Sequence, residues 1–365
     1  MPDWVMVSIM GALRKRTAQR AACVCIEWHN SVQKAKDQGM YDVKLHVVAA
    51  GGHATVVCSF EGELFTFGDN WKGMLGHHRG QKKERVPRLV KALAGKKVVG
   101  AAAGYNHTAV WTEAGELFTC GCGGAGKLGH GGEDNERVPK LVEALAGIEV
   151  ASATVSFSHS AVWTKGGELF TFGNGKKGRL GHGGGENERV PRLVQALAGK
   201  KVIGAAAGAN HMAVWTEAGE LFTFGCGRWG KLGHGRGEND WCVPKLVEVL
   251  AGKDVIGATA GDHHTAVWTE AGELFTFGCG VYGRLGHAEE VNEPVPILVE
   301  ALVGKDVVGA TAGDTHTAAW TEAGELFTFG HGNLGQLGHG GDGQGGDNVE
   351  AVPRLVEALV GKKVG

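Results

Sequence analysis

Five glycine-rich loops have the residue types and spacing that could bind a phosphate. The pattern Gly-x-Gly-x-x-Gly begins at Gly121, Gly173, Gly225, Gly278 and Gly330. A dinucleotide site also needs a helix after the loop, because the amino terminus of that helix holds the phosphate. No helical pattern follows these loops, which continue as Leu-Gly-His and then as a Gly- or Glu-rich stretch. We therefore interpret them as turns and expect no nucleotide or other cofactor.

Histidine is the second residue type that suggests chemistry. Of the 17 histidines, one set of six closes the Leu-Gly-His strings and another six lie at the start of a hairpin pattern. A buried histidine at a repeated position usually satisfies a backbone hydrogen bond. His263 and His264 are adjacent, but no nearby Cys or His completes a metal set. With no triad or carboxylate pair apart from the repeats, we predict no catalytic or metal site and favour a non-enzymatic role.

The composition limits where the chain works and what it binds. The eight cysteines show no disulfide framework, which indicates reduced thiols in a cytoplasmic or nuclear protein. The formal net charge of −2 implies no general attraction to nucleic acid or to a membrane. No stretch approaches the length that spans a bilayer, and no secretory signal is expected.

The elements that carry these residues recur along the chain. The string Gly-Glu-Leu-Phe-Thr-Phe-Gly occurs almost unchanged six times, starting at Gly62, Gly115, Gly167, Gly219, Gly272 and Gly324. A period near 50 residues is typical of a propeller or another repeat array. Motifs that appear once per repeat therefore belong to the architecture by default, and function is sought in what differs between repeats.

One repeat has the pattern of a small antiparallel sheet. His107–Thr112 alternates in side-chain direction, and the turn Glu113–Gly115 leads to a second strand, so the pair reads as a hairpin. Residues 138–142 contain a proline and fit an edge strand. Three or four short strands per repeat make a propeller blade. We predict an all-β propeller of six repeats over residues 45–365, preceded by a short α-helical segment over residues 1–44. The ring either closes with six blades or, as we favour, is an incomplete or open seven-blade ring.

Aromatic side chains mark the expected core. A tryptophan recurs at one position of five repeats, and a phenylalanine recurs at another. Each such side chain buries roughly 150–250 Å², which at about 25 cal/mol per Å² is worth on the order of 4–6 kcal/mol gross. Packing therefore explains these aromatic residues, and we do not expect them to hold a ligand or act as a chromophore.

The order of motifs in a repeat resembles a known family. The string from Gly104 through His107 to Thr112, then Gly115–Phe118 and Gly126–His130, resembles the regulator of chromosome condensation repeat. The resemblance covers about 320 residues and implies a β-propeller, usually of seven blades. Some members exchange nucleotide on a Ran-type GTPase through a projecting wedge, and here only the sixth repeat has a longer loop, at 341–348. The slot between the repeated Gly and His lacks the Trp-Arg pair of the plant photoreceptor, so photoreception is not expected.

The first forty residues do not repeat and carry a second resemblance. Apolar residues there have helical spacing, which would suit two amphipathic helices. Those helices could simply cap the propeller, or the segment could be an F-box, which it resembles in its Met-Pro start and its later Val-Cys and Trp residues. An F-box implies docking to a Skp-type adaptor of a cullin ubiquitin ligase. The residues expected to contact the adaptor are Pro2, Ile9, Val24, Cys25 and Trp28.

The tips of the glycine loops differ between repeats and are the candidate binding site. Equivalent loops of a propeller share one face, so we expect a basic ring with exposed aromatic residues, of the types that dominate interface energy. The alternative is a solvated face of balanced charge. The predicted partner-binding residues are Trp71, Lys72, Lys127, Lys176, Lys177, Arg179, Arg228, Trp229, Lys231, Tyr282 and Arg284.

These observations favour a propeller that binds a protein partner. It could serve as the substrate receptor of a cullin-type ubiquitin ligase. Guanine-nucleotide exchange on a Ran-type GTPase and association with chromatin are the alternatives, and bare DNA is disfavoured by the net charge.

Overall fold

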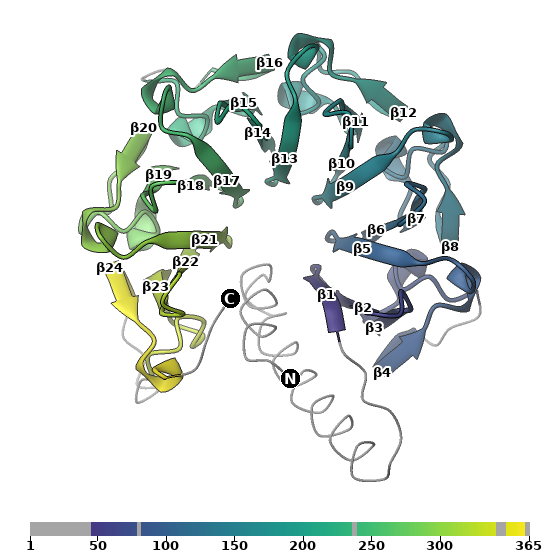
Figure 1. Ribbon diagram of the computed structural model, residues 1–365, viewed down its shortest axis with the longest axis horizontal. Helices are drawn as coiled ribbons and strands as arrows, with labels where there is room; N and C mark the ends of the chain where they lie inside the picture. Colours follow the sequence, from purple (N-terminus) through teal and green to yellow (C-terminus); the bar gives the residue numbers. More distant parts are fainter. Residues whose placement is uncertain (1–44, 79–81, 236–238, 341–347, 362–365) are drawn as a thin grey trace. The chain divides into compact units, whose positions relative to one another are not determined.

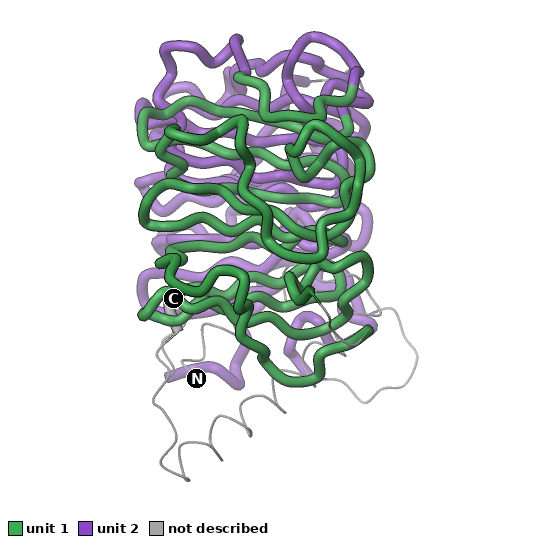
Figure 2. Tube along the Cα trace, turned by 90° about the vertical axis from the view of Figure 1, so that its right-hand side faces the viewer, with its two compact units in different colours: residues 1–174, 187–193 green, residues 175–186, 194–365 purple. Residues whose placement is uncertain are grey.

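The structure is a computed structural model that describes residues 45–78, 82–235, 239–340 and 348–361. Its contacts divide the chain into two compact units, drawn in two colours in Figure 2. Unit 1 comprises Met1–Asn174 and Asn187–Leu193, and unit 2 comprises Gly175–Glu186 and Val194–Gly365. Each unit contains three sheets.

Every repeat forms one antiparallel sheet of four strands in sequential order, as the all-β prediction requires (Figure 1). The strands of unit 1 are β1 (Leu45–Ala50), β2 (Ala54–Ser59), β3 (Leu64–Asp69), β4 (Lys83–Leu89), β5 (Val98–Ala103), β6 (His107–Thr112), β7 (Leu117–Gly121), β8 (Glu136–Leu141), β9 (Val150–Val155), β10 (His159–Thr164), β11 (Leu169–Gly173) and β12 (Glu188–Leu193). The strands of unit 2 are β13 (Val202–Ala207), β14 (His211–Thr216), β15 (Leu221–Gly225), β16 (Trp241–Leu246), β17 (Val255–Ala260), β18 (His264–Thr269), β19 (Leu274–Gly278), β20 (Glu293–Leu298), β21 (Val307–Ala312), β22 (His316–Thr321), β23 (Leu326–His331) and β24 (Val349–Leu355).

Helical structure in the described residues is limited to single 3-10 turns. One set follows the third strand of a sheet, at η1 (Trp71–Gly73), η3 (Gly124–Gly126), η5 (Lys176–Gly178), η7 (Arg228–Gly230) and η9 (Val281–Gly283). The other set follows the fourth strand, at η2 (Lys91–Leu93), η4 (Glu143–Leu145), η6 (Gln195–Leu197), η8 (Glu248–Leu250), η10 (Glu300–Leu302) and η11 (Glu357–Leu359). The glycine loops thus open no helix long enough to hold a phosphate, as expected from their sequence.

The hairpin pattern of the repeat is confirmed in the second sheet. β6 pairs with β7 in a register that places His107 opposite Gly121 and Trp111 opposite Leu117. The turn closes through a hydrogen bond from the Gly115 N–H to the Thr112 carbonyl, and Gly115 has a φ of 79°. A side chain at that φ would be strained, which explains the glycine at the end of each hairpin turn. β8 forms the edge of the sheet, as its proline predicted.

The repeated tryptophan lies across a β-bulge. The register of β5 against β6 shifts between Val98 and Gly100, and Gly100 faces Trp111. A Cβ atom on Gly100 would come within 2.1 Å of the indole ring. The tryptophan is only half-buried, whereas the repeated phenylalanines, such as Phe172 and Phe277, are fully buried. The phenylalanine is therefore the true core residue, and the tryptophan covers the bulge.

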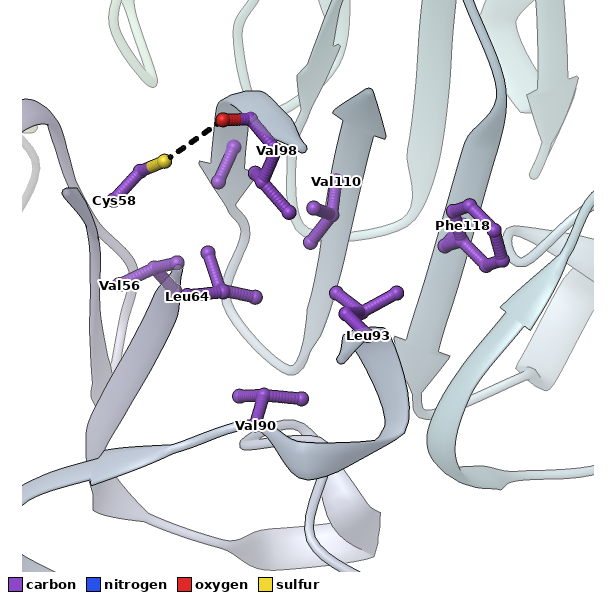
Figure 3. Packing of buried hydrophobic residues seen from close by; sticks show 9 residues of the cluster. Val56, Cys58, Leu64, Val90, Leu93, Val98, Val110 and Phe118 are labelled. Atoms are coloured by element: carbon purple, nitrogen blue, oxygen red, sulfur yellow. Dashed lines mark hydrogen bonds between the residues drawn. The ribbon is translucent and has the colours of Figure 1, made fainter. Parts of the chain in front are cut away.

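The core of each unit lies between neighbouring sheets. In Figure 3, Val56 and Leu64 of the first sheet and Val90 and Leu93 beyond it gather with residues of the second sheet, among them Val110. Cys58 stands in the tryptophan position of the first repeat, and its thiol donates to the Val98 carbonyl at 3.2 Å. Similar clusters join the second and third sheets of unit 1 and successive sheets of unit 2.

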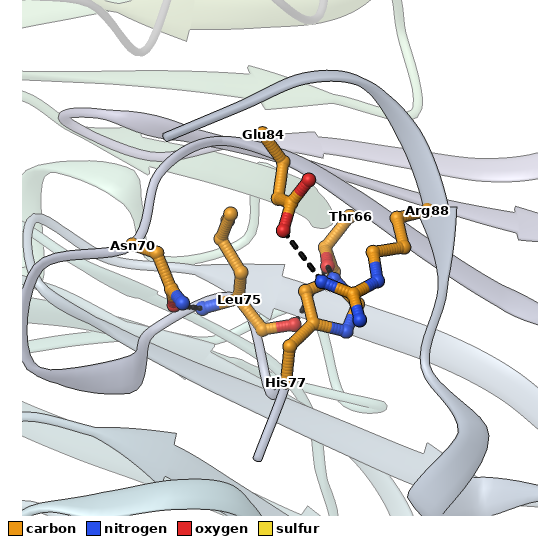
Figure 4. A network of polar contacts seen from close by, with 6 residues as sticks. All are labelled: Thr66, Asn70, Leu75, His77, Glu84 and Arg88. Atoms are coloured by element: carbon orange, nitrogen blue, oxygen red, sulfur yellow. Dashed lines mark hydrogen bonds and ion pairs between the residues drawn. The ribbon is translucent and has the colours of Figure 1, made fainter. Parts of the chain in front are cut away.

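A polar network joins the Leu-Gly-His string to the third strand of the sheet, as the first repeat shows. The Thr66 hydroxyl donates to the Leu75 carbonyl at 2.6 Å, and its oxygen lies 3.0 Å from Nε2 of His77 (Figure 4). Asn70 accepts the Leu75 N–H at 3.1 Å. Because the threonine proton is used on the carbonyl, the histidine donates through Nε2. The same Thr–Leu–His arrangement recurs in the second, fourth, fifth and sixth repeats, so these histidines are structural. Their partner is the threonine hydroxyl, and Nε2 of His339 also lies 3.5 Å from the backbone carbonyl of Thr328.

Two of the predicted segments lie outside the residues that the structure describes, and two further expectations concern the cysteines and membrane spans. The helical segment predicted over residues 1–44 lies outside the described residues, as does the longer loop at 341–347 of the sixth repeat. The cysteines in the described part of the chain carry free thiols. Among the described residues, no helix has the length and apolar character required to cross a membrane.

Candidate functional site

The tips of the glycine loops are held in an unusual backbone conformation. In five repeats the middle residue of the 3-10 turn has a positive φ of 57–64°; these residues are Lys72, Ala125, Lys177, Trp229 and Tyr282. Left-handed backbone costs a residue with a Cβ atom roughly 1–2 kcal/mol. The surrounding packing enforces this conformation and so fixes the direction of each tip side chain.

Close contact with the next sheet explains why the tip cannot relax. Gly230, which follows Trp229, has a φ of 79°, and a Cβ atom there would lie 2.3 Å from Cα of Pro294. The turn η7 thus packs its backbone directly against β20, and equivalent glycines do so in both units. Because backbone meets backbone at this point, the loop is a rigid platform for the residues that vary between repeats.

In unit 1 the first loop presents a stacked tryptophan and lysine. Trp71 is 50% exposed, and the Lys72 ammonium lies 4.4 Å from the centroid of its ring. Nζ of Lys72 also lies 3.5 Å from Sγ of Cys122, which belongs to the next repeat. The exposed aromatic residue predicted at this tip is confirmed in position, with a cation already oriented over its face.

In unit 2 the same kind of pair recurs with arginine. Arg228 is exposed, and its guanidinium carbon lies 4.2 Å from the centroid of the half-buried Trp229 ring. A second ring, that of His263, packs edge-on against Trp229 with 4.6 Å between the two ring centroids. Lys176 and Lys177 are exposed on the preceding loop, and Nζ of Lys177 lies 3.7 Å from Sγ of Cys226.

Four of the predicted cations are buried, so the expectation of an exposed basic ring is wrong for them. The exposed fractions are 5% for Lys127, 7% for Arg179, 2% for Lys231 and 3% for Arg284. Each of these side chains reaches a backbone carbonyl of the following repeat, about thirty residues further along the chain. Long side chains of this kind can pass along apolar surface to such acceptors, which sequence patterns do not reveal.

These buried cations form a carbonyl latch between neighbouring sheets of one unit. Arg284 donates from Nη1 to the Asp314 carbonyl at 2.7 Å and from Nε to the Val281 carbonyl at 2.8 Å. Its own carbonyl accepts the Thr317 hydroxyl at 2.8 Å. Lys127 and Lys231 make the corresponding pair of contacts in the second and fourth repeats. The repetition of a cation at this position is therefore explained by assembly of the sheets.

Burial also governs the electrostatics of the latch. It lowers the pKa of Lys231, and the nearby Cys226 opposes that effect. Burial lowers the pKa of Arg284 in the same way, and the nearby Cys279 and Asp314 act in the opposite direction by raising it. The hairpin histidine His264 lies in the same environment: burial, followed by the charge of Arg284, lowers its pKa well below 6.5. His264 is therefore neutral at physiological pH and is a poor candidate for acid–base chemistry.

Residues in the slot before the hairpin histidine make ring contacts, and His263 thereby meets the tip residue Trp229; none of them was among the predicted site residues. In unit 1, the rings of His53, Tyr105 and Phe157 follow one another at centroid separations of 4.9 Å, and Phe157 is 45% exposed. In unit 2, Nε2 of His263 lies 3.6 Å from an Asp314 carboxylate oxygen. The signal available in the sequence was that this slot varies from repeat to repeat.

Of the remaining predicted site residues, the structure describes Tyr282 but not the five expected adaptor contacts. Tyr282 is half-buried and its ring lies 4.5 Å from that of His331, another residue that varies between repeats. The five expected adaptor contacts at the amino terminus lie outside the described residues. Within the described ranges, no group of three or more His, Cys, Asp and Glu side chains is arranged to hold a metal ion.

Comparison with protein families gives one match over most of the chain. A model described as RCC1-like domain matches residues 19–365. That match begins inside the segment that we assigned to helices on sequence grounds and covers all six sheets.

Curated proteins with similar sequences include large ligases and a light receptor. E3 ubiquitin-protein ligase HERC2 of Mus musculus is 34% identical over 322 residues, which is 87% of this chain but 6% of that protein. Probable E3 ubiquitin-protein ligase HERC4 of Homo sapiens is 33% identical over 85% of this chain and 29% of its own length. Ultraviolet-B receptor UVR8 of Arabidopsis thaliana is 33% identical over 81% of this chain and 67% of its own length. The chain therefore spans only a small part of the two ligases.

Solved structures show the same architecture. The crystal structure of human WBSCR16 has a TM-score of 0.75 at 24% identity and covers 87% of this chain and 82% of its own. That of Prp20p from Saccharomyces cerevisiae has a TM-score of 0.74 at 21% identity, with 86% and 77% covered. At such identities the likeness speaks for the fold alone, and it identifies the six sheets as a propeller-like repeat fold.

Proposed function

Because the chain belongs to the family of RCC1-like domains, we propose that it is a non-enzymatic module that binds an acidic segment of a protein partner through its loop tips. The observation that carries this proposal is the pair of stacked tips, Trp71 with Lys72 and Trp229 with Arg228. In both pairs the cation is exposed to solvent while it lies over the indole ring.

The geometry of the tips suits recognition of carboxylates beside apolar groups. A cation held over an aromatic face needs little further ordering when it meets an anion, so less side-chain entropy is lost on binding. Tryptophan and arginine are also the residues that most often dominate interface energy. The strained turn beneath each tip supports this role, because it keeps Trp229 in one direction before a partner arrives.

The charges around the tips favour a protein over a nucleic acid. The whole chain carries a formal charge of −2, and the cations of the latch are buried against carbonyls. A nucleic-acid surface would need a continuous exposed basic stripe to follow the phosphates. The exposed cations of the tips, such as Lys177 and Arg228, are better matched to a short acidic segment.

The relatives suggest the setting in which such a module works. Because HERC2 and HERC4 are named as ubiquitin-protein ligases, we infer that this chain contributes partner recognition to a ubiquitin ligase, in the cytoplasm or the nucleus. The F-box-like segment would then dock a Skp-type adaptor through Pro2, Ile9, Val24, Cys25 and Trp28. In the full chain, Trp28→Ala should abolish capture of the adaptor, and unchanged capture would remove the adaptor from the proposal.

One structural relative supports a second candidate. Prp20p is described by its binding properties to Gsp1p and to histones, which corresponds to our alternatives of a small GTPase or chromatin as partner. A nucleotide-release assay with a Ran-type GTPase tests the exchange activity, and the salt dependence of nucleosome binding tests the chromatin alternative. Acceleration of release would favour exchange over the ligase role.

Substitutions at the tips test the main proposal. Trp71→Ala and Arg228→Glu should each weaken binding of an affinity-purified partner by about thirtyfold, the equivalent of roughly 2 kcal/mol. Phe60→Ala and Arg192→Glu are matched controls, because Phe60 is 56% exposed and Arg192 is an exposed arginine on β12, away from the tips. Equal loss in the tip variants and the controls would show that the partner does not recognise the tips.

We also propose that the six sheets belong to an incomplete or open seven-blade ring. A groove of about 220 Å³ runs along the sixth sheet and is lined by Leu326, Leu355 and Leu359, among others. The corresponding residues of the fifth sheet, Leu274 and Leu302, are covered by the sixth. A chain extended by a copy of its own sixth repeat should melt at a higher temperature than the original, and an unchanged melting temperature would argue against a vacant blade position.

A further inference from the structure

We propose that Lys72 and Cys122 form a modification site, in which peroxide joins the lysine nitrogen to the cysteine sulfur by a covalent bond. The two atoms lie 3.5 Å apart although fifty residues separate them in the sequence. Lys72 belongs to the turn η1 of the first repeat, and Cys122 follows β7 of the second. Such a bond would fasten the tip of one sheet to the next sheet of unit 1.

The surroundings of Cys122 select it for oxidation. The residue is 5% exposed, and two lysines flank it: the exposed Lys72 and the buried Lys127. Burial raises the pKa of its thiol, but the Gly124 backbone N–H and the two lysines together lower it below the usual value. The thiolate is the form that reacts with peroxide, so this cysteine is oxidised more readily than one in an apolar site.

Other cysteines of the same unit provide the contrast. Burial raises the pKa of Cys120, two residues earlier, to about 12, and that of Cys58 to about 11. Neither thiol has a lysine amine among its hydrogen-bond partners; Cys120 and Cys58 both donate to backbone carbonyls. We therefore expect the cross-link at a cysteine that directly follows the third strand of a sheet, and not at every buried cysteine.

The repeat itself supplies internal controls. Lys177 and Cys226 occupy the same two positions in unit 2, with 3.7 Å between Nζ and Sγ. In the other four repeats the lysine position holds Ala125, Trp229, Tyr282 or Leu334, none of which has an amine. The pairing of lysine with cysteine thus occurs twice, once in each unit, and we expect the closer pair in unit 1 to react first.

The reaction balances with one molecule of hydrogen peroxide. The thiolate sulfur attacks one peroxide oxygen, the O–O bond breaks, and the products are a sulfenic acid and hydroxide; the hydroxide takes a proton from the Lys72 ammonium to become water and leaves the amine neutral. The neutral amine of Lys72 then attacks the sulfur. The S–O bond breaks, the oxygen leaves as a second water with a proton from nitrogen, and a sulfur–nitrogen bond remains. An added dithiol restores both side chains by attacking the sulfur and returning a proton to the amine.

Mass spectrometry of the peroxide-treated full chain tests the proposal. After digestion without reductant, the peptides that contain Lys72 and Cys122 should appear as one joined species lighter by two hydrogens than the sum of the two. Dithiothreitol should release them. Cys122→Ser should remove the joined species, and Lys72→Arg should remove it while keeping the positive charge. Lys91→Arg, at an exposed lysine in η2, should leave it unchanged.

The opposite results are equally clear. Joined peptides that persist in Lys72→Arg would overturn the proposal, as would a wild-type chain in which Cys122 is found only as free thiol or as sulfinic or sulfonic acid. The melting temperature of each variant, measured before oxidation, separates loss of the cross-link from loss of the fold. Because the readout is the covalent bond, the result is independent of whether the loop tips bind an acidic partner.

Discussion

Acid should destabilise this protein through the hairpin histidines, and His264 shows how. This side chain is completely buried, and its Nε2 atom lies 2.8 Å from the Thr317 hydroxyl oxygen. That hydroxyl donates its own proton to the Arg284 carbonyl, so Nε2 of His264 is the donor to it. Nδ1 is then unprotonated, and it has no hydrogen-bond partner among the described residues. A second proton on this ring would be buried without an acceptor.

The size of the effect follows from proton binding in the two states. Burial, then Arg284 and His316, lowers the pKa of folded His264 well below 6.5, while the unfolded chain titrates near that value. Below pH 6.5 the unfolded state therefore binds the proton and the folded state does not, so stability is lost as the pH falls. From about pH 7.5 to about pH 5.5 the loss is about 1.4 kcal/mol for this one histidine, since one pKa unit corresponds to about 1.4 kcal/mol.

A single substitution isolates this contribution. His264→Gln retains an N–H donor near the position of Nε2 but cannot be protonated in this range. The free energy of unfolding is measured by urea titration of both proteins at about pH 7.5 and about pH 5.5. The difference in free energy of unfolding, variant minus wild type, should be about 1.4 kcal/mol more favourable at about pH 5.5 than at about pH 7.5. All other groups titrate alike in the two proteins, so their contributions cancel in this comparison.

Parallel stability profiles for the two proteins would refute the reasoning. They would mean that His264 accepts a proton in the folded state and that its pKa is not depressed. Thr317→Val serves as a further check, because it removes the hydroxyl acceptor while the histidine remains able to titrate.

Four further substitutions test the packing of the repeat, each by urea or thermal unfolding. Arg284→Met removes two charge-assisted hydrogen bonds and should cost about 3 kcal/mol. Lys231→Met removes a single hydrogen bond of 3.3 Å together with a buried charge, so the loss in free energy of unfolding should stay below about 1 kcal/mol. Equal losses in Arg284→Met and Lys231→Met would contradict the latch. Ala125→Gly should stabilise by about 0.5–1 kcal/mol because φ there is 63°, and a destabilised variant would argue against strain. Phe277→Ala should cost about 3–5 kcal/mol, and a loss under about 1 kcal/mol would place that ring outside the core.

Much of the fold could be predicted because local patterns and repetition agree. The alternation in His107–Thr112 and the glycine that follows the turn define a hairpin without any knowledge of distant contacts. The proline at position 139 marked the edge strand for a reason that is equally local, the missing N–H. The division into six equivalent sheets followed from the period of the repeat.

The candidate site was predictable only in part. Trp71 was correctly expected at an exposed loop tip, since a large aromatic residue in a variable turn has no core position to fill. Arg284 was expected to be exposed on the loop face, yet its guanidinium donates to a carbonyl thirty residues away. The sequence contains no sign of that acceptor, because a backbone carbonyl is present at every residue.

The sequence alone determined the type of element, the number of repeats and the residues that vary between them, because these depend on neighbours along the chain. The tertiary structure decided which charges are buried and which amine meets which thiol. Lys72 and Lys127 have the same side chain, but one lies over an exposed indole ring and the other reaches into the next repeat. The difference arises because sheets stacked in space bring groups some thirty to fifty residues apart within a few ångströms, and only that stacking sets which of them lose contact with water.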